Sequence, residues 1–264
     1  MQLEELQDPT IILGYSNQFI ADGRISYLFN NQDLGNRNKY FFFRANLELA
    51  GNSIYLAKRI GGENIVDTLP SELFNLKFAQ YFRPDFDLRF YKPVNFSNAL
   101  AVFRIAMGFG LAYGNSIKLP FEKSFYAGGP NDIRAWRTRN LGPGSNTKED
   151  YFERFGDIKI TTNLEYRFDI YRKLKGATFI DAGNIWLLKS FNNSTIGVFN
   201  TNTFLDQIAI GAGLGIRFDF TFFILRLDGA IQVRDPKQNL DERWVLPSKN
   251  LGDITYNFGI GYPF

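Results

Sequence analysis

Apolar and polar residues alternate through most of the chain, and this pattern predicts β-strands. The last stretch, residues 254–264, reads ITYNFGIGYPF, with large apolar or aromatic residues at every second position. The same period of two begins at Ile158 (IKITTNLEYRFDI), at Ile208 (IAIGAGLGIRFDF) and at Phe223. Because successive side chains of a strand point to opposite faces, each segment has one apolar and one polar face. The apolar face of the last strand is expected to carry Phe258, Ile260, Tyr262 and Phe264.

Nine segments have this character and are expected to be strands. They are Thr10–Asn30, Asn38–Ala50, Phe74–Tyr91, Asn98–Tyr113, Asp157–Ile170, Gly176–Trp186, Gln207–Phe220, Phe222–Arg234 and Ile254–Phe264. A tight turn at Ala21-Asp22-Gly23 would split the first segment and make ten strands. The apolar positions from Ile11 to Phe29 keep one parity throughout, however, which favours a single long strand.

Charged residues lie on the polar face of these segments, and they raise the question of which face meets water. A soluble sandwich would expose the charges and enclose the apolar set, whereas a membrane barrel would turn the apolar set to lipid and the charges to a wet lumen. The alternation alone fits both. The barrel alternative places Leu164, Tyr166, Leu214, Ile216, Phe258 and Ile260 outward, and Glu165, Arg167, Arg217, Arg226 and Asp228 inward.

Segment length and connection length favour the membrane barrel. The segments have about a dozen residues, whereas soluble strands most often have about 5–6 and tilted membrane strands need roughly 9–11. Connections alternate between short and long, as in outer-membrane barrels. The short ones are Lys92–Ser97, Tyr171–Lys175 and Asp219–Phe222, and the long ones are Gly51–Glu72, Tyr113–Gly156, Leu187–Asp206 and Arg234–Asp253. The sequence therefore predicts an all-β fold, an antiparallel transmembrane β-barrel.

Composition agrees with this fold and excludes several functions. Aromatic residues make up 17% of the 264 residues, and 28 of them are phenylalanine, which suits a lipid-facing surface. The net charge of +3 is too small to indicate a nucleic-acid partner. Cysteine and histidine are absent, and no G-x-S-x-G elbow occurs, so we expect no enzymatic activity, no metal site and no cofactor.

The N-terminal sequence MQLEELQDPT lacks the basic start and apolar region of a secretory signal. A nine-stranded arc would also leave two open edges, and unpaired backbone in lipid costs several kcal/mol per group. We therefore expect residues 1–264 to be the C-terminal part of a larger barrel, from a split or truncated reading frame or a cropped sequence. The alternative is a small pore that closes by itself or through an oligomer.

The longest loop, residues 114–156, carries the most specific local sequence. Its segment 125–145 reads FYAGGPNDIRAWRTRNLGPGS. Gly, Pro, Asn and Asp are turn residues, so a polar outer loop is the simplest interpretation. A solvated loop does not need the tetrad Ile133-Arg134-Ala135-Trp136 beside Gly128 and Gly129, however, and this tetrad predicts a tip that docks into the lumen. There Arg134 would need a carboxylate, which Glu165 or Asp181 could supply.

Two details of the lumen follow from this docking. For Asp181 to face inward, Ile180 and Ala182 must face lipid, with Phe179 and Gly183 inward beside the loop. The inward glycines Gly211, Gly213 and Gly215 would form a groove for the loop, or they would only relieve crowding in a curved sheet.

These motifs resemble those of the C-terminal barrel of the BamA/TamA-type outer-membrane assembly and translocation superfamily (bacterial surface antigen type), and the closest branch is the TamL-like one. Ile133-Arg134-Ala135-Trp136 is similar to the family's V-R-G-F/Y loop motif, although Ala135 and Trp136 depart from it. Phe179, Asp181 and Gly183 match its F-x-D-x-G motif, whose Asp receives the loop Arg. The resemblance implies a sixteen-stranded barrel, five strands after the loop, an aromatic last residue and POTRA domains upstream of this chain.

The resemblance also implies a function at the bacterial outer membrane, which is to assist insertion or translocation of other proteins. Its implied partners are outer-membrane lipid, client β-barrel or secreted proteins, and periplasmic or lipoprotein accessory subunits. The last strand, Ile254–Phe264, would form half of the seam at which client strands pair. Two alternatives stay open: a passive porin-like or structural barrel, and a barrel anchor for a lost fused domain such as a patatin-like hydrolase.

Overall fold

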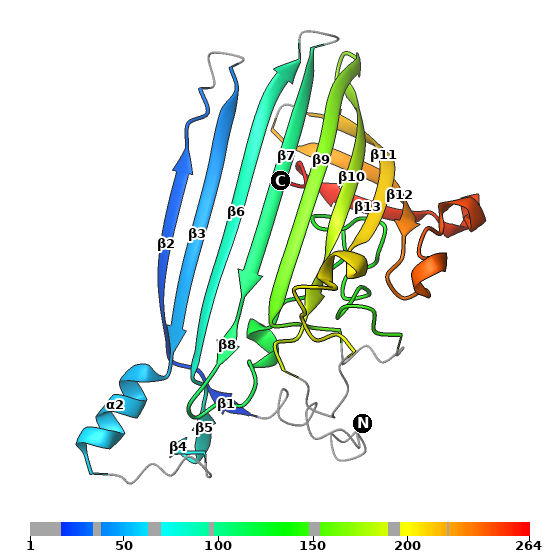
Figure 1. The fold of residues 1–264 in the computed structure, drawn as a ribbon. Coiled ribbons are helices and arrows are strands. Elements are labelled where there is room, and N and C mark those ends of the chain that lie inside the picture. The colour runs from blue at the N-terminus through cyan, green and yellow to red at the C-terminus, as the bar shows by residue number, and fades with distance from the viewer. Residues whose placement is uncertain are drawn as a thin grey trace.

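A long antiparallel sheet dominates the computed structural model, which describes residues 17–33, 38–62, 70–94, 98–147, 154–189, 196–220 and 222–264 (Figure 1). Its strands are β2 (Asp22–Asn30), β3 (Tyr40–Ala50), β6 (Tyr81–Val94), β7 (Ala99–Phe109), β8 (Leu111–Ala112), β9 (Ile158–Tyr171), β10 (Leu174–Trp186), β11 (Ala209–Asp219), β12 (Ile224–Arg234) and β13 (Thr255–Ile260). They follow the order β13-β12-β11-β10-β9-β7-β6-β3-β2, with β8 paired to β6. Neighbours in the sequence are therefore neighbours in the sheet.

The remaining elements are short and lie in the loops. They are β1 (Gln18–Phe19), β4 (Glu72–Leu73), β5 (Leu76–Phe78), the helix α2 (Asn52–Ile60), and the 3-10 turns η2 (Phe121–Lys123), η4 (Phe204–Gln207), η5 (Leu240–Glu242), η6 (Leu246–Ser248) and η7 (Leu251–Asp253). β1, β5 and β4 form a separate small sheet in which β1 and β5 run parallel. Among the described residues, no helix is both long and apolar enough to cross a membrane.

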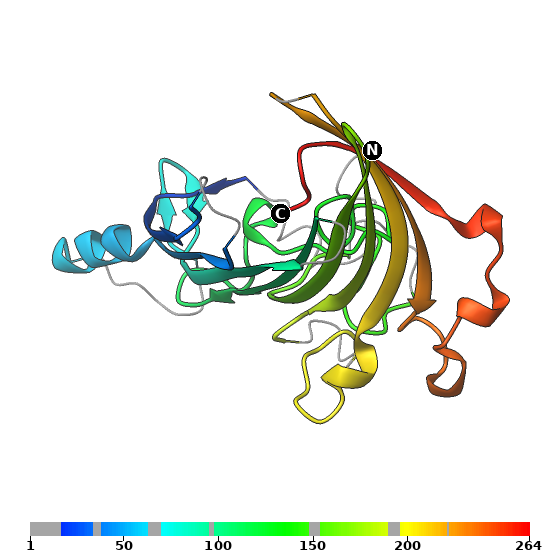
Figure 2. The same cartoon turned by 90° about the horizontal axis from the view of Figure 1, so that it is seen from above.

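The large sheet curves into an arc whose concave side encloses part of the long loop and the C-terminal residue (Figure 2). Within the described residues the arc is not closed, and β2 and β13 are its two edges. Every pair within it is antiparallel. The prediction of an antiparallel barrel wall, present here as an open part of a barrel, is confirmed.

The two faces of the sheet differ as the alternation predicted. Leu214 and Phe258 on the convex face are 70% and 66% exposed, and Leu164, Ile216 and Ile260 are exposed beside them. On the concave face, Glu165, Arg167, Arg217, Arg226 and Asp228 are all buried. A soluble protein would place these two sets the other way round, so the exposed apolar face is the one that meets lipid.

The N-terminal third departs from the expected strands. Residues 17–30 do not form one long strand, because β1 pairs with β5 in the small sheet. They do not form a hairpin at Ala21-Asp22-Gly23 either, because Asp22 and Gly23 belong to β2. Residues 1–16 lie outside the described part. The strand expected over Phe74–Tyr91 begins only at Tyr81, where β6 starts. Phe74 and Asn75 take positive φ and form the turn between β4 and β5.

Two further departures concern loops at the same end of the barrel. The connection expected over Gly51–Glu72 contains α2, which begins directly after β3. The strand expected over Asn98–Tyr113 breaks at Gly110, whose N–H donates to the Asp157 carbonyl at 2.7 Å. A Cβ at Gly110 would lie 2.3 Å from the Leu119 side chain, so the incoming loop occupies that space.

Candidate functional site: a loop docked inside the barrel

The long loop after β8 folds back into the concave side of the sheet (Figures 1 and 2). Its two flanks are held together by isolated bridges between Phe125 and Gly156 and between Ala127 and Leu141. The loop tip, residues 128–137, is closed by two hydrogen bonds. Gly129 N–H donates to the Trp136 carbonyl at 2.8 Å, and Gly128 N–H donates to Asp132 Oδ2 at 2.8 Å.

The tetrad at the tip is buried, and its apolar members form part of the hydrophobic core inside the barrel. Ile133, Ala135 and Trp136 pack with Phe179 and other residues of the wall and the loop. The core cluster consists of Phe125, Ala127, Ile133, Ala135, Trp136, Leu141, Phe179, Ile185, Ala209 and Ala230. Burial of this many apolar side chains stabilises the docked loop, since removal of apolar surface from water is favourable.

Arg134 is fully buried and reaches carboxylates on three strands. Its Nε and Nη2 donate to the two oxygens of Asp181 on β10, at 2.8 and 2.9 Å. Its Nη1 donates to Glu165 Oε2 on β9 at 2.7 Å and lies 3.4 Å from Asp228 Oδ2 on β12. The Phe179 ring stacks on the guanidinium, with its centroid 3.3 Å from Cζ. Both carboxylates proposed from the sequence therefore contact Arg134, and Asp228 is a third.

Three further arginines surround these carboxylates. Arg167 Nε donates to Glu165 Oε1 at 2.8 Å, Arg217 contacts Glu165 and Asp228, and Arg226 Nε lies 3.6 Å from Asp228 Oδ2. We call the seven groups the lumen cluster: Arg134, Arg167, Arg217, Arg226, Glu165, Asp181 and Asp228. Arg167 Nη2 also donates to the Phe264 oxygen, at 3.2 Å. Removal of any partner from such a desolvated network leaves a buried charge without its counter-ion.

The strand register explains why Asp181 reaches the loop. Asp181 lies opposite Asn163 on β9 and Gly211 on β11, and all three positions face inward. Asn163 Nδ2 donates to Asp181 Oδ1 at 2.8 Å, which orients the carboxylate toward Arg134. Ile180 is half exposed on the lipid side and Ala182 is partly exposed. Both residues therefore face lipid, as expected when Asp181 faces the lumen.

The inward glycines do not all serve the loop. A Cβ at Gly211 would lie 2.5 Å from the Ala135 Cβ, so this glycine provides the space for the tip. Gly213 instead makes room for the Phe179 ring, and Gly215 for the Asp228 and Arg217 side chains. Gly183, with φ +154, approaches the β9 backbone at Ile160. The groove prediction is therefore correct at Gly211, whereas Gly213 and Gly215 accommodate side chains of the wall.

Strand β13 also holds the loop tip. Asn257 Nδ2 donates to the Arg134 carbonyl at 2.9 Å, and Thr255 Oγ1 donates to the Ala135 carbonyl at 3.2 Å. These contacts were not predicted from the sequence. The alternation along β13 could have predicted them, because Thr255 and Asn257 alternate with the outward residues Tyr256 and Phe258 and therefore face inward.

The expectation that the last aromatic residues share one outward face is wrong. Phe258 and Ile260 point outward, but β13 ends at Ile260 and Gly261 takes φ +85. After this turn Phe264 is 8% exposed and packs inside the barrel against Tyr91 and Val102. Tyr262 is half-buried, with its ring centroid 4.2 Å from Arg167 Cζ. The turn at Gly261 breaks the period of two that the sequence continues to display.

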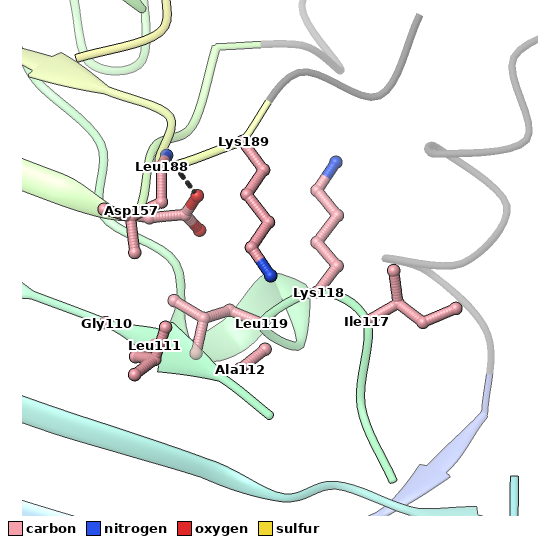
Figure 3. A pocket seen from close by; sticks show the side chains of 9 residues that line it. All are labelled: Gly110, Leu111, Ala112, Ile117, Lys118, Leu119, Asp157, Leu188 and Lys189. Atoms are coloured by element: carbon pink, nitrogen blue, oxygen red, sulfur yellow. Dashed lines mark hydrogen bonds between the residues drawn. The ribbon is translucent and has the colours of Figure 1, made fainter. Parts of the chain in front are cut away.

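A small pocket lies where the loop enters the barrel (Figure 3). Its volume is about 20 Å³, enough for a water molecule. Lys118 and Lys189 lie around Asp157, whose carboxylate accepts a hydrogen bond from Leu188 N–H at 2.9 Å. Burial raises the pKa of the Asp157 carboxyl above its ordinary value, against the opposing effect of this hydrogen bond and the lysines.

The lipid-facing wall, the docked loop and the charged lumen define a class of protein, the outer-membrane β-barrels with an internal loop. The chain belongs to the Omp85 superfamily, because the family model described as "Omp85 superfamily domain" matches residues 70–264. A relative is "Outer membrane protein assembly factor BamA" from Neisseria meningitidis serogroup B (strain ATCC BAA-335 / MC58). It is 26% identical over 40% of this chain and 16% of the relative, so the match spans a small part of that relative's length.

Proposed function

We propose that this chain forms the barrel portion of a factor that assists insertion or translocation of proteins at the bacterial outer membrane. One observation carries the proposal: Arg134, from a loop tip, is bound inside the barrel by carboxylates of β9, β10 and β12. A loop that only covered the barrel mouth would not need a desolvated ion network. Membership of the Omp85 superfamily and the similarity to an assembly factor support the same conclusion.

The proposed mechanism connects this loop to the edge strand β13. In the described sheet β13 pairs with β12 on one side, so its other edge is available for a client β-strand. Main-chain hydrogen bonds at a free strand edge are the usual basis of strand addition. Because Asn257 and Thr255 of β13 bind the carbonyls of Arg134 and Ala135, the docked loop fixes the position and twist of that edge.

Several finer features belong to the same proposal. The proposed partners are outer-membrane lipid, client β-barrel or secreted proteins, and periplasmic or lipoprotein accessory subunits. A sixteen-stranded barrel and a place in the TamL-like branch are proposed from the sequence motifs, and a non-enzymatic role is proposed from the lack of cysteine, histidine and a G-x-S-x-G elbow in the sequence.

The experiment reconstitutes the full-length protein in liposomes and measures the folding rate of a urea-denatured outer-membrane barrel added from outside. We expect faster client folding than in empty liposomes, and loss of most of this acceleration in Arg134→Ala. Arg137→Ala is the matched control, because Arg137 lies on the same loop but is exposed. Ion conductance without any acceleration of client folding would contradict the proposal and favour a passive pore.

A further inference from the structure

The helix α2 has an apolar face that the protein does not cover. None of its nine residues is buried. Leu56 and Ile60, which lie one turn apart on the same face, are 57% and 78% exposed. Ile54 and Tyr55 are only partly exposed, so the opposite side of the helix faces the rest of the chain. A helix with this distribution needs a further apolar environment for Leu56 and Ile60.

The position of α2 indicates which environment that is. The helix begins two residues after Ala50, the last residue of β3. Leu49 is outward and 41% exposed, so the lipid-facing band of the wall extends to the end of that strand. Both views show α2 at the β2–β3 end of the sheet, projecting outward and away from the docked loop (Figures 1 and 2). The helix therefore lies at the rim of the lipid-facing band.

The charges of α2 suit a lipid surface. The helix contains Lys58 and Arg59 in its last turn and no acidic residue. Basic residues at the polar side of an amphipathic helix are attracted to anionic headgroups, while its apolar face enters the headgroup boundary. The exposed Phe74, at the turn between β4 and β5, adds a large apolar side chain to the same end of the barrel.

We propose that α2 is an interfacial helix that binds the membrane surface surrounding the barrel. Leu56 and Ile60 enter the acyl boundary, and the exposed Arg59 binds the phosphate groups of anionic lipids. The occupant is the bilayer itself and not a second protein, since the helix is continuous with the lipid-facing wall. This inference does not depend on the proposed assembly function.

A single fluorescent label tests the apolar contact. The chain contains no cysteine, so Leu56→Cys introduces the only labelling site within it. An environment-sensitive dye at this position, in the full-length protein in phosphatidylglycerol-containing liposomes, is expected to shift to the blue and to be quenched by nitroxide lipids. Leu240→Cys is the matched control, because Leu240 is similarly exposed but lies on η5 in another long loop. Leu214→Cys on the outer wall reports that the barrel has inserted.

Aqueous iodide provides the opposing measurement. The proposal would be overturned if iodide quenched the label at position 56 as strongly as the label at position 240, while the label at position 214 was protected. The charge contribution is tested by Arg59→Glu. We expect the nitroxide quenching at position 56 to depend less on anionic lipid in this variant, whereas Lys249→Glu on a different loop leaves that dependence unchanged. An equal dependence in the two variants and the parent protein would exclude headgroup binding by Arg59.

Discussion

At the scale of single residues, Arg134 is a fully buried charge of the docked loop, and its guanidinium lies among three carboxylates. The planar shape of the side chain allows it to bind Asp181 through two parallel hydrogen bonds. A lysine would keep the charge but lose this geometry. The ion network therefore selects one residue type at this position.

Replacement of either partner should destabilise the docked loop. Arg134→Ala or Asp181→Ala leaves buried charges without a counter-ion, and the expected cost is about 3–5 kcal/mol in the free energy of unfolding. The double mutant should cost less than the sum of the two single mutants, because the groups interact directly. Urea unfolding in lipid bilayers gives the energies, and limited proteolysis gives the exposure of the loop. Arg137→Ala is the control, and additive effects would contradict the ion pair.

The residues around Arg134 differ in how far the sequence predicted them. Glu165 and Asp181 follow from strand parity together with the family motif. Asp228 was assigned to the correct face, but its contact with Arg134 depends on the curvature of the sheet, which brings β12 near β9 and β10. Alternation determines the face of a side chain, whereas the distance between non-neighbouring strands depends on the whole arc.

At the scale of elements, the long loop has a second anchor near its start. Lys123 of η2 donates to Asp22 on β2 and Glu48 on β3, both at 2.5 Å. Tyr81 on β6 donates to the same Glu48, which is buried. The Lys123 carbonyl accepts a hydrogen bond from Arg83 Nε at 2.7 Å. The loop thus connects the first strands of the sheet to β9, β10 and β12.

Loss of this second anchor should loosen the start of the loop without releasing Arg134. Lys123→Gln is expected to lower the free energy of unfolding by about 1–3 kcal/mol, because it removes a charged partner from buried Glu48. Glu122→Gln is the matched control on the same turn, where the side chain is exposed. Proteolysis mapped by mass spectrometry should show new cleavage near residue 123 and none at the loop tip. Cleavage at the tip as well would show that the two anchors act as one.

The end of β13 gives a different test. Phe264 packs inside the barrel with Tyr91 and Val102, while Phe222 in the turn before β12 is 86% exposed. Deletion of Phe264 should impair insertion into the outer membrane, as the sequence predicts, and Phe264→Ala should lower stability by about 1–3 kcal/mol. Phe222→Ala is the control. Normal outer-membrane levels and normal heat-modifiable mobility of the deletion variant would contradict this expectation.

Local chemistry explains which elements the sequence could predict. The segments that became β9, β11 and β12 alternate regularly and therefore form strands with the expected faces, whereas β10 turns Phe179 inward on the same face as Asp181. α2 was missed because its nine residues include Ile54, Tyr55 and Leu56 in succession, which show no clear helical period in so short a segment. The inward turn of the C-terminal residues depends on the backbone of Gly261, and the sequence of alternating residues continues past it unchanged.

At the scale of the whole molecule, the outer face distinguishes a membrane barrel from a soluble sheet. Leu214 lies near the middle of β11 and faces outward, with 70% of its surface exposed. In a bilayer, Leu214→Arg would place a charge in hydrocarbon and should lower the free energy of unfolding by about 2–4 kcal/mol. Leu240→Arg, at a similarly exposed position in a loop, should change it by less than about 0.5 kcal/mol. Urea titrations in bilayers measure both values, and equal, small effects would mean that the convex face is in water.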